Sequence, residues 1–443
     1  METILARIAE IAKEKANERF TSLAHIIDEI MLIDCHFVLK ERKAPGVDNV
    51  TKAEYGNNLQ QNISNLVNSM KRQAYKPQPV RRTYIPKPGT DEMRPLGIPA
   101  YEDKVAQLAL SKILNAIYEA DFLDCSFGFR PNLGCHDALK VLTHIIEKRA
   151  INYIVDADIK GFFNHVDHQW LMKFIGLRIA DTNILRLIAR FLKAGVMEEG
   201  VVSSTPEGTP QGGVVSPILA NIYLHYALDL WFEKVVQKQC RGEAYMVRYC
   251  DDFVCCFQYE EEAKSFYGAL IDRLGKFNLE IAEEKSKIIA FGRRANDNNC
   301  KRLGKGKAET FDFLGFTHCC SKSRKGWFRV KRKTSRKKYK ASLLRCKEWL
   351  RQNRSMPILE LMNKLKIKLY GYYRYYGISD NSYMLDKFRH EVRGMLFKWL
   401  NRRSQRRSFN WDKFALFEKK YPLPRPRIYV NIYNLKPNIG CNL

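Results

Sequence analysis

The sequence of 443 residues lacks any long uninterrupted run of apolar side chains. A membrane-spanning helix needs roughly 20 such residues, and a signal peptide needs a basic segment followed by a short apolar one. The N-terminus has neither pattern, so we expect a cytoplasmic protein with no membrane partner. Hydrophobic residues still make up 45% of the chain, which is enough to bury a core and excludes disorder as the dominant state.

Cysteine pairs with the spacing of a metal site are also absent. The chain contains 12 Cys but no C-x-x-C sequence. In the cytosol this pattern predicts reduced thiols and argues against a disulfide framework or a zinc knuckle.

Acidic residues are scarce in the C-terminal part of the chain. Residues 321–443 contain 33 Lys and Arg against 7 Asp and Glu, whereas the first 320 residues contain 42 and 41. Nearly all of the formal net charge of +27 therefore lies in this segment. Aromatic residues are interleaved with the basic ones, as in Trp327-Phe328-Arg329. Since cations bind phosphates and bases stack on aromatic rings, the segment predicts a nucleic-acid partner more than a merely solubilising surface.

Three carboxylates lie in or beside short apolar runs that are typical of strands. Asp251 and Asp252 separate the runs 245–249 and 253–257, and Asp158 lies in the run 153–159. Strand residues alternate between faces, so two adjacent carboxylates cannot both point into a core, and we place them at a hairpin tip. Turn chemistry alone would explain an isolated Asp-Asp pair. A third carboxylate on another buried strand instead favours a site for Mg²⁺.

Two such ions about 4 Å apart activate an attacking hydroxyl and stabilise the leaving oxygen in phosphoryl transfer. Together with the basic segment, the carboxylates predict nucleotidyl transfer at a nucleic-acid end. Mixed strands and helices followed by a basic helical tail predict the α+β fold class.

Several motifs then resemble, in order, those of reverse transcriptases encoded by group II introns. They are Arg94–Pro99, Ser126–Pro131, Asp158–Phe163, Gly208–Pro217, the Y-x-D-D box Tyr249–Asp252, and Phe313–Phe316. The resemblance implies a right-hand polymerase of the bacterial type, with fingers and palm, a helical thumb and no endonuclease domain. The implied domains are a helical N-terminal extension (1–50), fingers and palm (51–320), a helical thumb or maturase domain (321–400) and a basic C-terminal segment (401–443).

The resemblance also implies roles for individual residues. Asp158, Asp251 and Asp252 would be catalytic and would bind two Mg²⁺ ions. The incoming dNTP would be contacted by Lys87, Arg94, Phe163, Gln211 and Lys285, with the Phe163 ring excluding a 2′-hydroxyl. Nucleic acid would be contacted by Arg130, Phe313, Gly315, Arg402, Arg403, Arg406 and Arg407.

Structural explanations stay open for some of these residues. Phe163 and Phe313 also fit a core, and Lys87, Arg94 and Lys285 also fit a solvated surface. Cys250, where many intron relatives carry Ala, is interpreted as a neutral variant.

The implied function is DNA synthesis on an RNA template from a DNA or RNA primer, with maturase-type binding of a structured group II intron RNA for splicing and mobility. A domesticated reverse transcriptase in phage defence or DNA repair stays possible. So does a non-catalytic RNA-binding splicing factor, although three intact carboxylates argue against it. The sequence does not indicate the oligomeric state or the cognate RNA.

Overall fold

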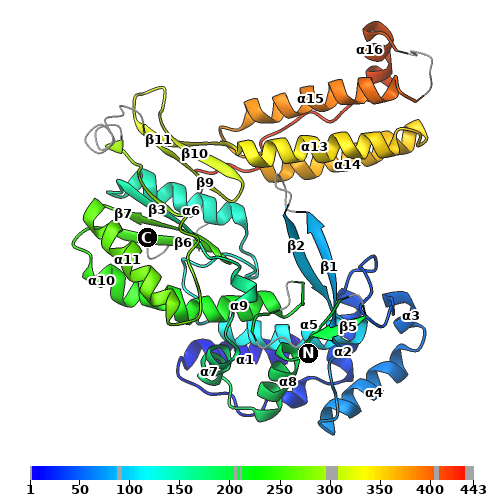
Figure 1. Cartoon of the computed structure of the whole chain (residues 1–443), viewed down its shortest axis with the longest axis vertical. Helices are drawn as coiled ribbons and strands as arrows, with labels where there is room; N and C mark the ends of the chain where they lie inside the picture. The colour runs from blue at the N-terminus through cyan, green and yellow to red at the C-terminus, as the bar shows by residue number, and fades with distance from the viewer. Residues whose placement is uncertain are drawn as a thin grey trace. The chain divides into compact units, whose positions relative to one another are not determined.

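A computed structural model describes residues 2–86, 92–198, 200–203, 207–209, 212–295, 308–403 and 409–434 (Figure 1). They form two compact units, of which unit 1 takes its residues from 1–86, 92–138 and 155–288, and unit 2 from 139–154 and 289–443. Helices and sheets occur in both units, which confirms the α+β class. Among the described residues, no helix is long and apolar enough to cross a membrane. The domain boundaries predicted at residues 50, 320 and 400 stay predictions, because a compact unit need not coincide with a functional domain.

Unit 1 begins with short helices that pack on one long buried helix. α5 (Tyr101–Tyr118) is buried along most of its length, and α1 (Glu2–Glu14) and α2 (Glu29–Val38) pack against it. The single helix expected over residues 1–40 is wrong, because the chain makes only the 3-10 turn η1 (Ala24–Ile26) between α1 and α2. Its backbone N–H groups donate instead to a carboxylate far along the chain, that of Asp181.

The remaining helical segments of unit 1 follow the sequence. They are α3 (Lys52–Gly56), α4 (Leu59–Lys71), η2 (Phe162–Asn164), α7 (His168–Gly176), α8 (Thr182–Leu192), α9 (Ser216–Leu224), the π-helices η3 (His225–Asp229) and η4 (Phe232–Val236), α10 (Gln237–Gln239) and α11 (Glu260–Gly275). α6 (Cys135–Lys148) begins in unit 1 and ends in unit 2.

Two four-stranded sheets complete unit 1. The first has the order β2-β1-β4-β5, in which β1 (Val80–Pro86) pairs antiparallel with β2 (Met93–Ile98) and parallel with β4 (Val196–Glu198), and β5 (Val201–Ser203) closes the edge. The second has the order β6-β7-β3-β8.

This second sheet positions the predicted catalytic residues. β6 (Ala244–Tyr249) and β7 (Asp252–Phe257) are antiparallel, and β7 is also the neighbour of β3 (Tyr153–Asp158), beside which lies β8 (Lys287–Ala290). Every residue of β7 after its first is buried, and α11 packs on this strand.

Unit 2 combines a three-stranded antiparallel sheet with helices. The strands are β9 (Thr310–Phe313), β10 (Phe316–Lys322) and β11 (Phe328–Thr334), and the helices are α13 (Arg336–Asn353), α14 (Ile358–Tyr376), α15 (Ser382–Leu400) and α16 (Trp411–Lys420). The strand expected over residues 311–316 is in fact two strands, because Leu314 and Gly315 turn the chain with φ angles of 49° and 81°.

The segment predicted as a helical thumb, 321–400, also begins with a strand. In β11 the buried residues Val330, Arg332 and Thr334 alternate with the exposed Lys331 and Lys333. The buried arginine hides this alternation from a hydrophobicity pattern.

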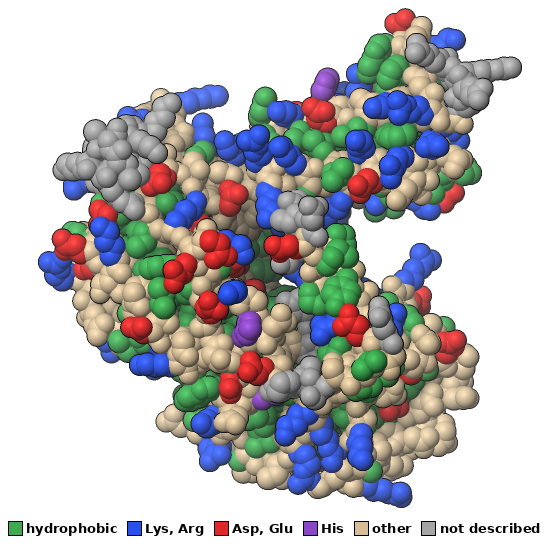
Figure 2. Space-filling view, viewed as in Figure 1, with side chains coloured by type: hydrophobic (Ala, Val, Ile, Leu, Met, Phe, Trp, Pro, Cys, Tyr) green, Lys and Arg blue, Asp and Glu red, His purple; other side chains and the backbone are tan. Residues whose placement is uncertain are grey.

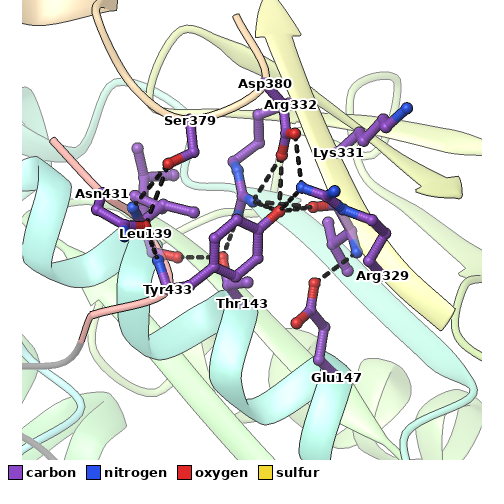
Figure 3. A network of polar contacts seen from close by, with 12 residues as sticks. Leu139, Thr143, Glu147, Arg329, Lys331, Arg332, Ser379, Asp380, Asn431 and Tyr433 are labelled. Atoms are coloured by element: carbon purple, nitrogen blue, oxygen red, sulfur yellow. Dashed lines mark hydrogen bonds and ion pairs between the residues drawn. The ribbon is translucent and has the colours of Figure 1, made fainter. Parts of the chain in front are cut away.

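A polar network ties the C-terminal residues to this sheet (Figure 3). The hydroxyl of Tyr433 donates to the Asp380 carboxylate at 2.6 Å and accepts hydrogen bonds from Arg329 and Arg332. The Arg332 side chain, which is 1% exposed, also donates to Thr143 at the unit 2 end of α6. Segments far apart in the sequence are thereby joined in one unit.

Candidate active site

A tight hairpin carries two of the predicted catalytic residues. Tyr249 lies opposite Asp252 in the β6–β7 pair, so Cys250 and Asp251 form a two-residue loop. Cys250 has a φ of 61°, which lies in the left-handed region and is strained for a residue with a Cβ. Asp251 is half-buried and Asp252 is exposed. The predicted placement of both carboxylates at a hairpin tip is confirmed.

The hairpin rests on a buried guanidinium group. The Arg248 side chain is fully buried and donates to the Cys250 carbonyl at 2.9 Å. It also donates to both carboxylate oxygens of Asp229, to the Ser126 hydroxyl at 2.8 Å and to the side-chain oxygen of Asn221 at 3.2 Å. Burial lowers the pKa of Arg248, but the pairing with Asp229 more than offsets this and keeps the group charged.

A glycine allows a second segment to lie against the loop. A Cβ on Gly128 would lie 2.4 Å from the Cys250 backbone nitrogen, so no side chain fits there. The Gly128 carbonyl accepts from Asn221 at 2.6 Å, and the Phe127 N–H donates to the Arg248 carbonyl at 2.8 Å. The block Ser126–Pro131 therefore supports the hairpin.

Four of the predicted residues form a charged cluster. Burial raises the pKa of the Asp251 carboxyl, the negative charge of Asp158 raises it further, and Arg94 lowers it. Asp158 ends β3, and its carboxylate lies 3.5 Å from the ammonium group of Lys285. Two carboxylates at neighbouring strands thus have one cation beside each of them.

The donor chemistry of this cluster suits a divalent metal. Membership of residues 85–318 in a polymerase family, reported below, implies such a metal in general terms. Asp158 and Asp251 offer the hard oxygen ligands that Mg²⁺ prefers, and a bound cation would remove the repulsion that raises the pKa of Asp251. Within the described residues, however, no three His, Cys, Asp or Glu side chains are grouped closely enough to form a metal site. The ligand set with Asp252 as third member stays a prediction.

The predicted aromatic gate lies just after Asp158, in η2. Phe162 is 1% exposed and belongs to the core, whereas Phe163 is half-buried. The Phe163 carbonyl accepts from the Thr209 N–H at 2.8 Å, and a Cβ on Gly208 would lie 2.8 Å from the same carbonyl oxygen. The inward-facing member of the pair is thus Phe162, and contact of Phe163 with a nucleotide stays a prediction.

Four predicted residues lie outside the described residues, namely Lys87, Gln211, Arg406 and Arg407. The neighbour of Gln211, Gly212, has a φ of 116°, and a Cβ there would lie 2.6 Å from the Gly97 carbonyl oxygen. The blocks around residues 97 and 212 therefore lie against each other.

Three residues predicted to contact nucleic acid have internal structural roles. Arg130 pairs with Glu119 at 2.7 Å and donates to two backbone carbonyls, with only 8% of its side chain exposed. Phe313 is 1% exposed in β9, as the core alternative required, and Gly315 forms the β9–β10 turn. These roles account for the residues without a nucleic-acid contact.

Two further residues predicted to bind nucleic acid, Arg402 and Arg403, are exposed after the end of α15. The Arg402 guanidinium lies over the Trp399 ring, 5.4 Å from its centroid. Arg403 donates to the Met356 carbonyl at 2.9 Å. Their contact with nucleic acid stays a prediction.

The sequence reasoning missed the residues beneath the hairpin, above all Arg248 and Asp229. One signal was available, because Arg248 is a charged residue inside the apolar run 245–249. A charge in a buried strand requires a buried partner.

Comparison with known proteins agrees with this geometry. Residues 85–318 match the family described as reverse transcriptase (RNA-dependent DNA polymerase), and residues 337–417 match the maturase-specific domain of group II introns. Over 226 residues the chain is 41% identical to the group II intron-encoded protein LtrA of Lactococcus lactis subsp. cremoris, an alignment that covers 50% of this chain and 37% of LtrA. The chain therefore spans well under half the length of that relative.

Two other relatives extend the match. The chain is 32% identical over 325 residues to the protein YkfC of Escherichia coli strain K12, covering 66% of this chain and 80% of YkfC. It is 29% identical over 313 residues to the putative COX1/OXI3 intron 2 protein of Saccharomyces cerevisiae, covering 69% of this chain and 33% of that protein.

Proposed function

Because this chain belongs to the reverse transcriptase family and carries a group II intron maturase domain, we propose that it is an RNA-directed DNA polymerase that also binds a structured intron RNA. The observation that carries the polymerase assignment is the pair Asp158 and Asp251, which lie at neighbouring strands of one sheet close enough to influence each other's charge. A polymerase needs such a pair where the primer end meets the nucleotide.

In this proposal Asp158, Asp251 and Asp252 hold two Mg²⁺ ions. Bound there, the ions would activate the attacking primer hydroxyl and stabilise the leaving oxygen of the nucleotide. The carboxylates hold their positions because β3 and β7 are buried neighbours and because Arg248 anchors the loop between β6 and β7.

The surrounding residues would bind and select the dNTP. Arg94 and Lys285 lie beside the two carboxylates and would neutralise the triphosphate. Lys87 and Gln211 would make further contacts to the nucleotide. The Phe163 ring would pack on the sugar and leave no room for a 2′-hydroxyl, which favours dNTPs over NTPs.

The basic helices of unit 2 would bind the intron RNA and the template–primer duplex. α13 exposes many cations, and Figure 2 shows Lys and Arg side chains along the helices of this unit. The exposed basic residues of α13 are Arg336, Lys337, Lys338, Lys340, Arg345, Lys347 and Arg351. Such charge supplies affinity for phosphates with a steep dependence on salt.

Primer extension on a defined RNA template tests the polymerase function. The reaction is run with Mg²⁺ and with dNTPs or NTPs in parallel, for the parent and for Asp251→Ala. The matched control is Asp272→Ala, which removes an exposed carboxylate from α11. We expect extension with dNTPs only, loss of extension in Asp251→Ala and no change in the control.

RNA binding by the same variants is measured by filter retention. Asp251→Ala should bind RNA as the parent does, because it removes one carboxylate and no cation. Extension that survives in Asp251→Ala would contradict the catalytic assignment. Tight RNA binding by a parent that cannot extend a primer would favour a non-catalytic splicing factor, and extension by a gene without flanking intron RNA would favour a domesticated enzyme.

A further inference from the structure

The guanidinium of Arg248 has a partner for every N–H group it carries. An arginine side chain has five such groups in a rigid planar fork. Here Nε and Nη2 bind the two oxygens of Asp229, Nη2 also binds Ser126, and Nη1 binds Asn221 and the Cys250 carbonyl. Four of these contacts fix the fork, and the fifth, at 2.9 Å, reaches the loop that carries Asp251.

One helical segment supplies two of these acceptors. Asn221 lies in α9, and Asp229 is the last residue of η3, the π-helix that directly continues α9. Both side chains are fully buried. π-helical turns are rare and occur mostly at functional sites. The irregular turn places a carboxylate under the β6–β7 hairpin.

The loop itself needs an external restraint. Cys250 has a left-handed φ without being glycine, a conformation that persists only where the surroundings enforce it. Its carbonyl belongs to the peptide unit that leads directly into Asp251. Releasing that carbonyl would let this peptide rotate, and the Asp251 carboxylate would move away from Asp158.

We propose that Arg248 and Asp229 are positioning residues, which hold the Asp251 carboxylate in the orientation that binds a divalent cation. This inference rests on the proposed function, because it assumes that Asp251 is a metal ligand. Lysine cannot replace Arg248, since an ammonium group is a point charge without the planar fork that reaches five partners. The pair touches neither primer nor nucleotide, so it acts through the hairpin alone.

Binding of Mn²⁺ to the full chain, followed by electron paramagnetic resonance, tests the inference without requiring catalysis. The first variant is Arg248→Lys. The second is the double variant Arg248→Met/Asp229→Leu, which removes both buried charges at once and so leaves neither unpaired. The matched control is Arg178→Lys, at another buried Arg–Asp pair of unit 1, with Asp121 at 3.0 Å.

We expect both Arg248 variants to bind Mn²⁺ about 10- to 100-fold more weakly than the parent, the range found when a group that orients a metal ligand is removed. Extension should slow by a similar factor while the KM for dNTP is unchanged. Arg178→Lys should keep the parental Mn²⁺ affinity, even where it lowers the urea midpoint.

A double variant that unfolds at the parental urea midpoint and binds Mn²⁺ like the parent would overturn the inference. Should the double variant fail to fold, Arg248→Lys decides in the same way. A parent that binds no Mn²⁺ would overturn it as well. A parent that binds Mn²⁺ but does not extend a primer would refute the proposed function, while the affinities of the variants would still decide the positioning role.

Discussion

Removal of one hydroxyl group should measurably loosen unit 2. In Tyr433→Phe the ring is kept, and with it the stacking of the Arg329 and Arg332 guanidinium groups, 5.1 and 5.5 Å from its centroid. What is lost is the hydroxyl that donates to Asp380 at 2.6 Å and accepts from both arginines (Figure 3). Burial raises the pKa of Tyr433 to about 12, so the hydroxyl is protonated at neutral pH.

The structure sets the expected size of the effect. A hydrogen bond to a charged group stabilises a protein by about 1.5–3 kcal/mol. Losses within one network are not additive, and Asp380 keeps its ion pair with Arg329 at 2.6 Å. We therefore expect Tyr433→Phe to lower the free energy of unfolding by about 1.5–3 kcal/mol, a fall of roughly 3–12 °C in Tm for a unit of this size.

Urea denaturation followed by circular dichroism measures the loss, and hydrogen exchange at the amides of β11 locates it. The control is Tyr370→Phe, whose ring is 46% exposed on α14. Equal urea midpoints for the two variants and the parent would refute the reasoning, because they would show that the network contributes nothing at Tyr433.

The other predictions concern the site and the charges. Phe163→Ala should reduce discrimination against NTPs by roughly 10-fold or more, measured as the ratio of kcat/KM for dNTP and NTP; an unchanged ratio would remove the gate. Gly128→Ala should abolish extension and lower Tm, because its Cβ would lie 2.4 Å from the Cys250 nitrogen; parental activity would show that the hairpin yields at no cost. Burial lowers the pKa of His225 to about 4 and of His318 to about 3, so the unfolded chain binds more protons below pH about 6.5. The free energy of unfolding should then fall as the pH drops from about 6.5 towards 4, with a shallower slope in His225→Gln; identical slopes would exclude His225 as a source. Neutralising the C-terminal basic cluster should flatten the salt dependence of RNA binding by up to about 3 in log–log slope, since each lost phosphate contact removes about 0.7 for single strands; an unchanged slope would mean that the cluster does not touch RNA. Its members are Arg402, Arg403, Arg406 and Arg407.

The hairpin and its carboxylates were accessible from the sequence because they follow local rules. Two apolar runs around an Asp-Asp pair predict a tight turn, and the structure has it at Cys250-Asp251. The strand that bears Asp158 was likewise visible as an apolar run that carries carboxylates. Both signals need only the alternation of side chains along a strand.

The support of the hairpin was not accessible, because it depends on contacts between distant segments. Nothing local indicates that Gly128 meets Cys250, or that a π-helical turn places Asp229 beneath Arg248. The exposure of an arginine is equally invisible in sequence: Arg130 is consumed by Glu119 inside the protein, whereas Arg402 is exposed. Burial of polar residues is decided by tertiary partners, which composition does not reveal.

The interleaved composition of unit 2 sets a timetable for synthesis. Its first residues, 139–154, leave the ribosome long before residues 289–434, with which they share a core. The carboxylate of Glu147 accepts from the backbone N–H of Val330 at 2.7 Å, across a sequence separation of 183 residues. At about 5–20 residues per second, the end of α6 waits roughly 10–40 s for that partner. During this interval the residues that later face β11 are exposed on the nascent chain, where a chaperone would bind. A fragment that starts at residue 321 would lack these residues altogether and would not complete the unit.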